Sequence, residues 1–396
     1  MYFDFGNYLC VLRFAWRQRQ WPRRRRTVAK LLLLVPLQSL VHSVFFSLDY
    51  LLFPRLWRHR VDAPVFIVGH ARSGTTLMHR LLAADEARFS FFRYWETFFP
   101  ALSERLLIRA AARLDRRLLG GALRRRLAAW DERTFGPWRH MHEQGLWLAE
   151  EDLFVLRAAF VPQQWALEMP LSQELDIFHI DALAPKRRRR WLHHYRECVK
   201  RQLLYRGGGV RHLSKNPLMS GWVSALIETF PDARFVVLRR DPVQCIPSTL
   251  KLLEGSWRAR GWSAADCLPA LQALIRISLD SYHLPAAALA AHPQTPHCVV
   301  DYRELLEHPR ATLQDVCGTL GLPVSAAQRE ALRGLETRKR AGRRRFRYRL
   351  DDYPITARDI ERELAPFYDL HRWPRTGAAE AAGDSGAEAA KRELQP

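Results

Sequence analysis

The sequence has few cysteines, and none of them is spaced for a shared role. Its six cysteines are scattered over 396 residues without a Cys-x-x-Cys pair. Disulfide frameworks and structural zinc sites need cysteines at close, repeated spacings, and this pattern argues against both. We therefore expect reduced and mostly buried thiols, which favours a cytoplasmic active domain.

Acidic residues are scarce relative to basic ones. The chain has 41 Asp and Glu against 62 Lys and Arg, a net charge of +21. Such a charge suits polyanionic partners, namely nucleotides, acidic lipid surfaces, nucleic acid or acidic glycans. Hydrophobic residues make up 48% of the chain, enough for the core of one large or two smaller α/β domains.

The N-terminal segment lacks a small-residue cleavage site, although it contains a long apolar run. Residues 30–53 are strongly apolar and follow the basic run 23–26. The apolar run is long enough to cross a bilayer, but Pro36 and Asp49 interrupt it and a cleaved signal peptide fits poorly. Three interpretations stay open: a single span, an interfacial helix or hairpin on a membrane, and an apolar helix packed on the core.

A short apolar strand, a glycine loop and a helix start follow one another between Ala63 and Leu82. Residues 65–68 are wholly apolar, Gly69 ends the run, and a helical pattern begins near Gly74. This arrangement points backbone N–H groups and the positive end of a helix dipole at one place, where an anion can bind. The loop adds one guanidinium and three hydroxyl groups, from Arg72, Ser73, Thr75 and Thr76.

The loop lacks the lysine of a nucleoside triphosphatase. Gly69-x4-Gly74 is the spacing of a Walker A loop, but Thr75 stands where that lysine would reach the β- and γ-phosphates. The loop is therefore suited to a phosphate rather than to a triphosphate with its metal. We expect no metal site, since His140 and His142 are two residues apart and lack the helical spacing of a metal pair.

The stretch GHARSGTTLMHRLL resembles the 5′-phosphosulfate loop of the sulfotransferases, in the Arg-Ser-Gly-Thr-Thr form of tyrosylprotein sulfotransferases and related bacterial enzymes. The donor in that family is 3′-phosphoadenosine 5′-phosphosulfate, which has no γ-phosphate and needs no metal. Arg240 and Ser248 match the family's Arg-x7-Ser spacing, which holds the donor's 3′-phosphate. The resemblance covers residues 63–371, with His70-Ala71 where relatives commonly have proline before the arginine.

The resemblance also implies roles near the transferred group and around the nucleotide. Lys215, in LSKNP, matches a lysine close to the sulfuryl group, where Arg72 would also stabilise charge. Tyr302 lies in a family-like stretch, and the region around Arg347 and Tyr348 resembles the segment that closes over the nucleotide. We expect these residues to bind the donor.

The acceptor proton needs a general base, and several candidates stay open. Glu96, in RYWETF, lies at about the position of the catalytic glutamate in tyrosylprotein sulfotransferases, if a short insertion is allowed. His70 is the alternative within the loop, and His79 is a weaker one. Glu151 and Asp152 are candidates to line the acceptor site on composition alone.

The order of strands and helices predicts an α/β fold with a P-loop-like central parallel sheet flanked by helices. We expect strands at 65–68, ending at Lys215, at 234–238 and at 297–300. Residues 101–135 read as helices broken at Gly120-Gly121, with Leu and Ala inside, and residues 148–206 as largely helical. The predicted units are a basic, apolar, membrane-associated segment (1–60), a sulfotransferase domain (61–374) and a disordered tail (375–396).

The sequence thus predicts a sulfotransferase that moves a sulfuryl group to a hydroxyl or amine acceptor by metal-independent in-line transfer. We place it in the cytoplasm or on the cytoplasmic side of a membrane. Glycolipid, polysaccharide, peptide tyrosine and small alcohol acceptors stay open, and nucleic acid is not an expected partner. The alternatives are a P-loop-type kinase and a basic membrane-surface or nucleic-acid-binding scaffold without catalysis.

Overall fold

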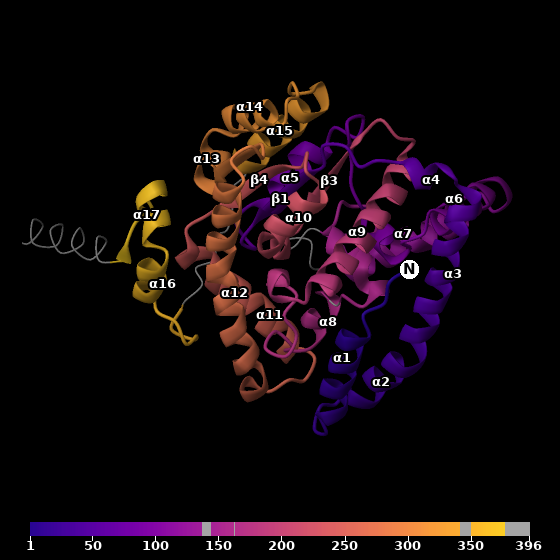
Figure 1. Cartoon of the computed structure of the whole chain (residues 1–396), viewed down its shortest axis with the longest axis horizontal. Helices are drawn as coiled ribbons and strands as arrows, with labels where there is room; N and C mark the ends of the chain where they lie inside the picture. Colours follow the sequence, from indigo (N-terminus) through magenta and orange to yellow (C-terminus); the bar gives the residue numbers. More distant parts are fainter. Residues whose placement is uncertain (137–143, 162, 341–349, 377–396) are drawn as a thin grey trace, which may run out of the picture.

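A parallel sheet of five strands organises the computed structural model, which describes residues 1–136, 144–161, 163–340 and 350–376 (Figure 1). The strand order is β2-β3-β1-β4-β5, and every neighbouring pair is parallel. The four expected strands are confirmed, and β2 is an addition too short for a sequence pattern. The strands are β1 (Val65–Gly69), β2 (Phe89–Ser90), β3 (Arg211–Lys215), β4 (Arg234–Arg239) and β5 (His297–Asp301).

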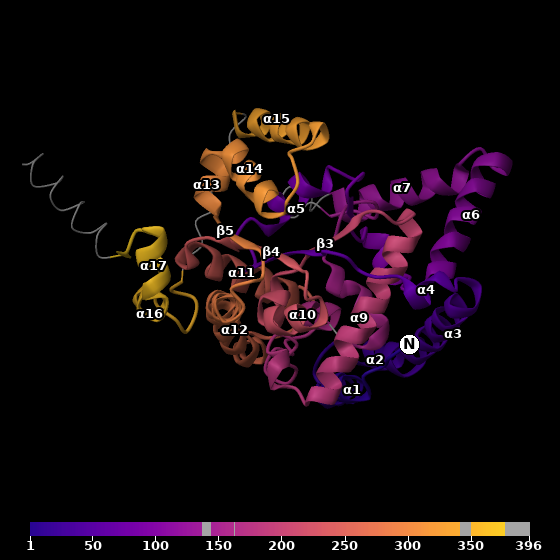
Figure 2. The same cartoon turned by 45° about the horizontal axis from the view of Figure 1, so that its top comes forward.

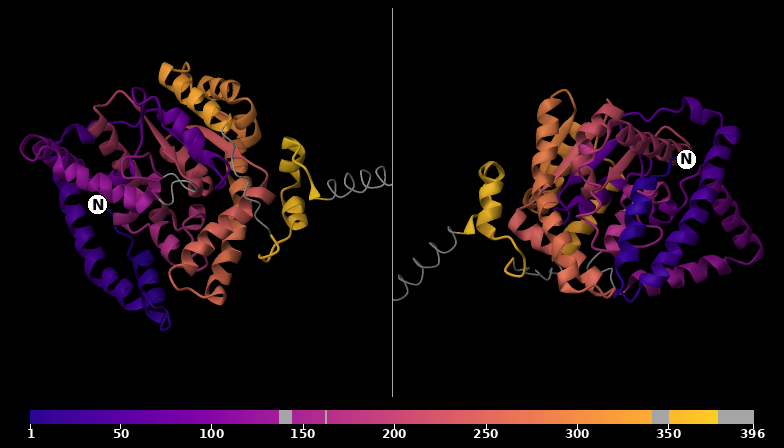
Figure 3. Two further views of the ribbon diagram at one scale, coloured as in Figure 1. Left: turned by 180° about the vertical axis from the view of Figure 1, so that it is seen from behind. Right: turned by 60° about the horizontal axis from the view of Figure 1, so that its bottom comes forward.

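Helices cover both faces of this sheet, which explains why β1 is buried along its whole length. Figure 2 shows α10 (Val223–Thr229), α11 (Pro242–Arg258) and α12 (Ala264–Ala291) on one side. The other side carries α5 (Thr75–Ala83), α14 (Pro309–Thr319) and α15 (Ala326–Arg340), with α13 (Tyr302–Glu307) after β5. Helices α16 (Ala357–Glu363) and α17 (Ala365–His371) lie at one side of the molecule (Figure 3). The expected fold class is confirmed.

The parallel pairing of the strands places the segments that follow them close together. Val65 at the start of β1 pairs with Leu213 of β3 and Arg234 of β4, and β4 ends with Arg239 opposite Asp301 of β5. Because all strands run in the same direction, their carboxyl ends share one edge. Ligands of open α/β sheets bind at this edge.

The apolar N-terminal segment forms one long helix at the border of the molecule (Figure 1). It comprises α2 (Arg24–Ala29), a π-helical turn η1 (Lys30–Leu34) and α3 (Val35–Leu52), preceded by α1 (Phe5–Arg17) and followed by α4 (Arg55–Arg58). Pro36 has no N–H to donate, and the wider π turn just before it lets the helix continue. The helix Arg24–Leu52 contains an 18-residue window with a mean hydropathy of 1.9, and 11% of that window is buried; by length and composition alone the helix could cross a membrane.

Helix α3 is bonded to the domain through its C-terminal half. Asp49 is fully buried, and its carboxylate accepts hydrogen bonds from the backbone N–H groups of Leu102 (2.7 Å) and Ser103 (2.8 Å). It also forms an ion pair with Arg201 of α9 (Pro185–Arg206), at 2.8 Å. Phe46 lies in the core formed with α9 and α10. The boundary expected near residue 60 therefore separates segments that share a core.

Residues 102–135 form a helical hairpin, and most of its leucines are not buried as expected. Its break at Gly120-Gly121 is confirmed, between α6 (Leu102–Leu118) and α7 (Ala122–Phe135). The leucines expected inside are exposed, however: Leu107, Leu114, Leu118, Leu119, Leu123 and Leu127 are each more than two-fifths accessible. Figure 2 shows the hairpin projecting from the domain, and among the described elements no further layer covers this face.

Residues 148–206 are less helical than expected. The segment contains a 3-10 helix η4 (Asp152–Ala159), α8 (Gln163–Glu168), a short 3-10 turn η5 (Ile180–Ala182) and α9. Much of 169–184 has no regular secondary structure, and side-chain hydrogen bonds help to hold it in place. His179 bonds Asp176 at 2.5 Å and Asp280 of α12 at 2.9 Å, which fixes this segment against α12.

Candidate active site

The two glycines of the loop after β1 are both required by its geometry. Gly69 has φ +127°, and a Cβ there would lie 2.1 Å from the carbonyl oxygen of Leu238. Gly74 has φ +97°, and a Cβ there would lie 2.5 Å from Cδ2 of Tyr302. The first glycine therefore permits close strand packing, and the second permits the approach of a ring to the loop.

The loop leads into α5, whose first turn has no side-chain cap. Gly74 is the N-cap and offers no side chain to the free N–H groups of the first turn. Thr75 is buried and Thr76 half-buried there. Ser73 is buried, and its hydroxyl donates to the carbonyl of His70 at 2.6 Å, so in this structure it shapes the loop. Arg72 is exposed with φ +68°, a left-handed conformation that non-glycine residues adopt mainly at special sites.

The second predicted signature meets this loop. The Nε of Arg72 donates to Oγ of Ser248 on α11 at 3.3 Å, and Nη1 of Arg240 donates to the carbonyl of Arg72 at 3.1 Å. The Tyr302 ring, just after β5, lies 4.7 Å from the guanidinium carbon of Arg240. Four predicted residues from three strand ends thus form one cluster. Within the described part of the chain, Nε of Arg240 is buried without a hydrogen-bond partner, which leaves a donor for a ligand.

Lys215 ends β3 on the other side of β1 and is 2% exposed. Its Nζ donates to Oε1 of Glu151 at 3.0 Å, while Gln163 donates to Oε2 of the same carboxylate at 2.6 Å. Asn216 donates to the Gln163 carbonyl at 3.0 Å, which fixes the orientation of that amide. The structure therefore places Glu151 beside Lys215, the lysine predicted to lie near the sulfuryl group. In the sequence, the only sign of this pairing is that Glu151 belongs to the acidic run 150–152.

Glu96 occupies a different environment. It lies in the 3-10 helix η2 (Tyr94–Phe98), is 1% exposed, and accepts hydrogen bonds from the Arg93 backbone (2.7 Å) and Gln202 (3.1 Å). Among the described residues it forms no hydrogen bond or ion pair with Lys215 or the loop arginine. Its carboxylate caps a helix end and contacts α9 in this structure.

The two loop-side histidines are neutral at physiological pH. Burial lowers the pKa of His70 to about 4, and its Nδ1 faces the carbonyl of Ala71. Burial also lowers the pKa of His79 well below its ordinary value, and the nearby charge of Lys215 adds to this. A buried imidazole with so low a pKa is a weak proton acceptor, so both are poor general bases.

Asp152 faces the core, in contrast to its neighbour Glu151. Its carboxylate accepts a hydrogen bond from the hydroxyl of Tyr195 and lies 3.3 Å from Nε2 of His212, and all three residues are at most 1% exposed. These contacts anchor the start of η4 beside the site. The predicted residues Arg347 and Tyr348, like the histidines at 140 and 142, lie outside the described residues.

The comparison with known families agrees with this geometry. A sequence profile described as the sulfotransferase family matches residues 64–326, two thirds of the chain. The chain belongs to the sulfotransferase family. This membership argues against the kinase and the non-catalytic scaffold.

The curated relatives that resemble this chain are mycobacterial proteins. This sulfotransferase is 25% identical over 266 residues to the omega-hydroxy-beta-dihydromenaquinone-9 sulfotransferase Stf3 of Mycobacterium bovis and Mycobacterium tuberculosis. That match covers 66% of this chain and 63% of the relatives' length.

Two crystal structures share the fold of this sulfotransferase. STF9 from Mycobacterium avium has a TM-score of 0.68 at 16% identity, covering 93% of this chain and 97% of its own. STF1 from Mycobacterium tuberculosis H37Rv has a TM-score of 0.64 at 21% identity, covering 91% and 92%. At these identities the likeness shows the fold alone.

Proposed function

We propose that this sulfotransferase moves a sulfuryl group from 3′-phosphoadenosine 5′-phosphosulfate to a hydroxyl or amine acceptor, without a metal. The observation that carries this proposal is the contact of Arg72 with Ser248, which joins the two phosphate-binding signatures across 176 residues. A donor with phosphates at both its 3′ and 5′ positions fits a site in which the backbone of one arginine accepts a hydrogen bond from the guanidinium of another. The unpartnered Nε of Arg240 and the uncapped start of α5 fit the same anions.

The donor-binding roles follow from the elements that hold each group. We assign the 5′-phosphosulfate to the N–H groups of residues 74–76 and the hydroxyl groups of Thr75 and Thr76, with Ser73 holding the loop. Arg240 and Ser248 would hold the 3′-phosphate, because a guanidinium fork and a hydroxyl can bind one phosphate from two sides. Tyr302 supports both by packing on Gly74 and Arg240. Arg347 and Tyr348 stay predicted nucleotide contacts.

The residues around Lys215 suggest how transfer is assisted. A bond forms between the acceptor oxygen or nitrogen and sulfur while the sulfur–oxygen bond to the donor phosphate breaks, and adenosine 3′,5′-bisphosphate leaves. Negative charge grows on the leaving oxygen, where the cations of Arg72 and Lys215 stabilise it. The acceptor proton passes to a carboxylate. We assign this role to Glu151, since it lies 3.0 Å from Lys215, and keep Glu96 as the second candidate.

We infer that the acceptor is lipid-linked and that the enzyme works at the cytoplasmic surface of a membrane. The named relative acts on a hydroxylated menaquinone, although the match covers only part of its length. The exposed apolar faces of α3 and of the adjoining α6–α7 hairpin provide a surface that a bilayer would cover. Since α3 is bonded to the domain through Asp49, it is suited to lie in the interface rather than to span it.

The donor assignment is tested with Arg72→Ala and Arg240→Ala, with Arg276→Ala on α12 as a matched exposed control. Each site variant removes charge-assisted hydrogen bonds worth about 1.5–3 kcal/mol, so the affinity for adenosine 3′,5′-bisphosphate should fall about ten- to hundredfold in calorimetry. Transfer of the sulfur-radiolabelled sulfuryl group from 3′-phosphoadenosine 5′-phosphosulfate to lipid extracts should be lost in both. Near-normal binding and transfer by both variants would reject the assignment.

A further inference from the structure

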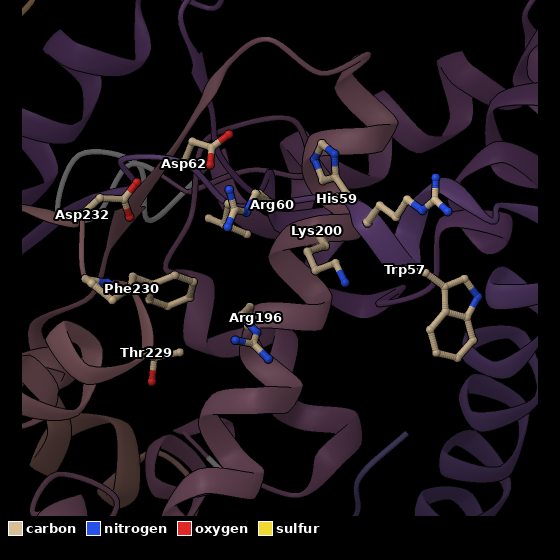
Figure 4. A pocket seen from close by; sticks show the side chains of 12 residues that line it. Trp57, His59, Arg60, Asp62, Arg196, Lys200, Thr229, Phe230 and Asp232 are labelled. Carbon is tan, nitrogen blue, oxygen red and sulfur yellow. The ribbon is translucent and has the colours of Figure 1, made fainter.

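A cavity of about 620 Å³ lies away from the active site, beside the end of the apolar helix (Figure 4). Its walls are formed by the segment 57–62, by Arg196 and Lys200 of α9, and by the turn 229–232. The first segment leads into β1 and the turn leads into β4, so the cavity lies at the amino ends of these parallel strands. The phosphate loop follows their carboxyl ends, about 17 Å away along a five-residue strand.

The cavity carries a surplus of positive charge. Figure 4 shows Arg60, Lys200 and Arg196 around the hollow, with Asp62 and Asp232 together at one side. In the described part of the chain, neither of these two arginines is within ion-pair distance of a carboxylate, and Arg58 next to them is equally unpaired. By contrast, Lys200 is paired with Glu197 at 2.9 Å, and Asp232 accepts a hydrogen bond from the backbone of Ala63 at 2.6 Å.

One wall of the cavity also holds an unsatisfied polar atom. Nε2 of His59 is buried and has no hydrogen-bond partner among the described residues. A buried polar atom without a partner is costly, and a ligand can satisfy it. The volume is within the range of small-ligand sites, and the arginine forks match the geometry of a phosphate.

The apolar stripe of α3 leads directly to this cavity. Leu33 of η1 and Leu37, Leu40, Val44 and Leu51 of α3 are exposed by 58–79%. Their spacing of three, four and seven residues places them on one face of the helix. Trp57, 69% exposed, lines the cavity, and its ring lies 4.7 Å from that of Tyr50 near the end of the same helix, with the two planes tilted by 42°. Tryptophan and arginine beside an apolar helix face are typical of the boundary between acyl chains and headgroups.

We propose that this cavity binds the phosphate headgroup of an anionic membrane lipid while the apolar face of α3 lies in the acyl layer. The proposal rests on the membrane contact suggested for α3, and it is independent of sulfuryl transfer. Arg60 and Arg196 bind the phosphate from opposite walls, and His59 completes the site. The headgroup thereby fixes the orientation of the enzyme at the surface that holds its acceptor.

The test uses the full chain with the double variant Arg60→Glu/Arg196→Glu, and Arg276→Glu/Arg333→Glu as a control with the same change in charge. Sedimentation is measured with vesicles of phosphatidylcholine alone and with vesicles containing one third phosphatidylglycerol. Soluble glycerol 3-phosphate is the competitor. The pocket variant should lose at least about tenfold in affinity for the anionic vesicles, as expected for two basic residues at such a surface. Its binding to neutral vesicles and to adenosine 3′,5′-bisphosphate should match the wild type.

Each other outcome overturns a defined part of the reasoning. Wild-type binding by the pocket variant, or an equal loss in the control, would show that general charge attracts the vesicles and that the cavity is no headgroup site. Tight binding of glycerol 3-phosphate without any vesicle binding would assign the cavity to a soluble phosphate and reject the lipid. If the wild type itself does not bind neutral vesicles, the membrane contact of α3 is rejected. The donor assignment does not depend on this result, because the calorimetric experiment tests it separately.

Discussion

Replacing Asp49 by alanine should destabilise the protein strongly, because this carboxylate joins α3 to the domain. It accepts two N–H groups at the start of α6 and pairs with Arg201, and both charged side chains are fully buried. Loss of the helix-cap contacts costs about 1 kcal/mol. Breaking a buried ion pair costs about 3–5 kcal/mol, reduced here because Arg201 keeps Glu197 at 3.1 Å. We expect a total near 4 kcal/mol.

Urea denaturation followed by tryptophan fluorescence measures this loss, with Asp315→Ala on the exposed side of α14 as the control. The control should stay within about 0.5 kcal/mol of the wild type. Hydrogen exchange at the backbone of Leu102 and Ser103 should quicken in the Asp49 variant, since their acceptor is gone. Unchanged stability and exchange would mean that α3 is detached from the domain in solution, which would refute the interfacial interpretation and restore a single membrane span.

Three further predictions concern the site and its surroundings. Gly74→Ala should weaken adenosine 3′,5′-bisphosphate binding at least about tenfold in calorimetry, because the new Cβ strains the backbone and clashes with the Tyr302 ring. The control Gly334→Ala, which has open space at its Cβ, should leave the affinity unchanged. Equal affinities of the two variants would contradict the loop geometry. Glu151→Gln should lower kcat about a hundredfold or more at saturating donor, and Glu96→Gln much less, so a larger loss in the second variant would move the general base to Glu96. Hydrogen bonds to Asp176 and Asp280 raise the pKa of His179 above 6.5. The variant His179→Ala should therefore be less stable than the wild type mainly below that pH, and the difference in urea midpoint should shrink as pH rises through the raised pKa. A loss of stability that stays constant with pH would show that the charge of His179 contributes nothing.

The sequence by itself determined the parts of this protein that depend on neighbouring residues. A run of apolar residues between Ala63 and Gly69, a glycine loop and a helix start can only form a strand–loop–helix, because backbone hydrogen bonding and the left-handed glycine conformations are local properties. The four main strands and the break of the α6–α7 hairpin are therefore where their patterns predict them.

Only the tertiary structure decided what meets across long stretches of chain. The pairing of Lys215 with Glu151, the contact of Arg72 with Ser248 and the use of Asp49 to cap α6 join residues 53 to 176 positions apart. No local pattern encodes these contacts, since they depend on how the strands are ordered in the sheet and on which helix faces are buried. For the same reason the exposed leucines of α6 and α7 looked internal: helical periodicity marks an apolar face, but the fold determines whether anything covers it.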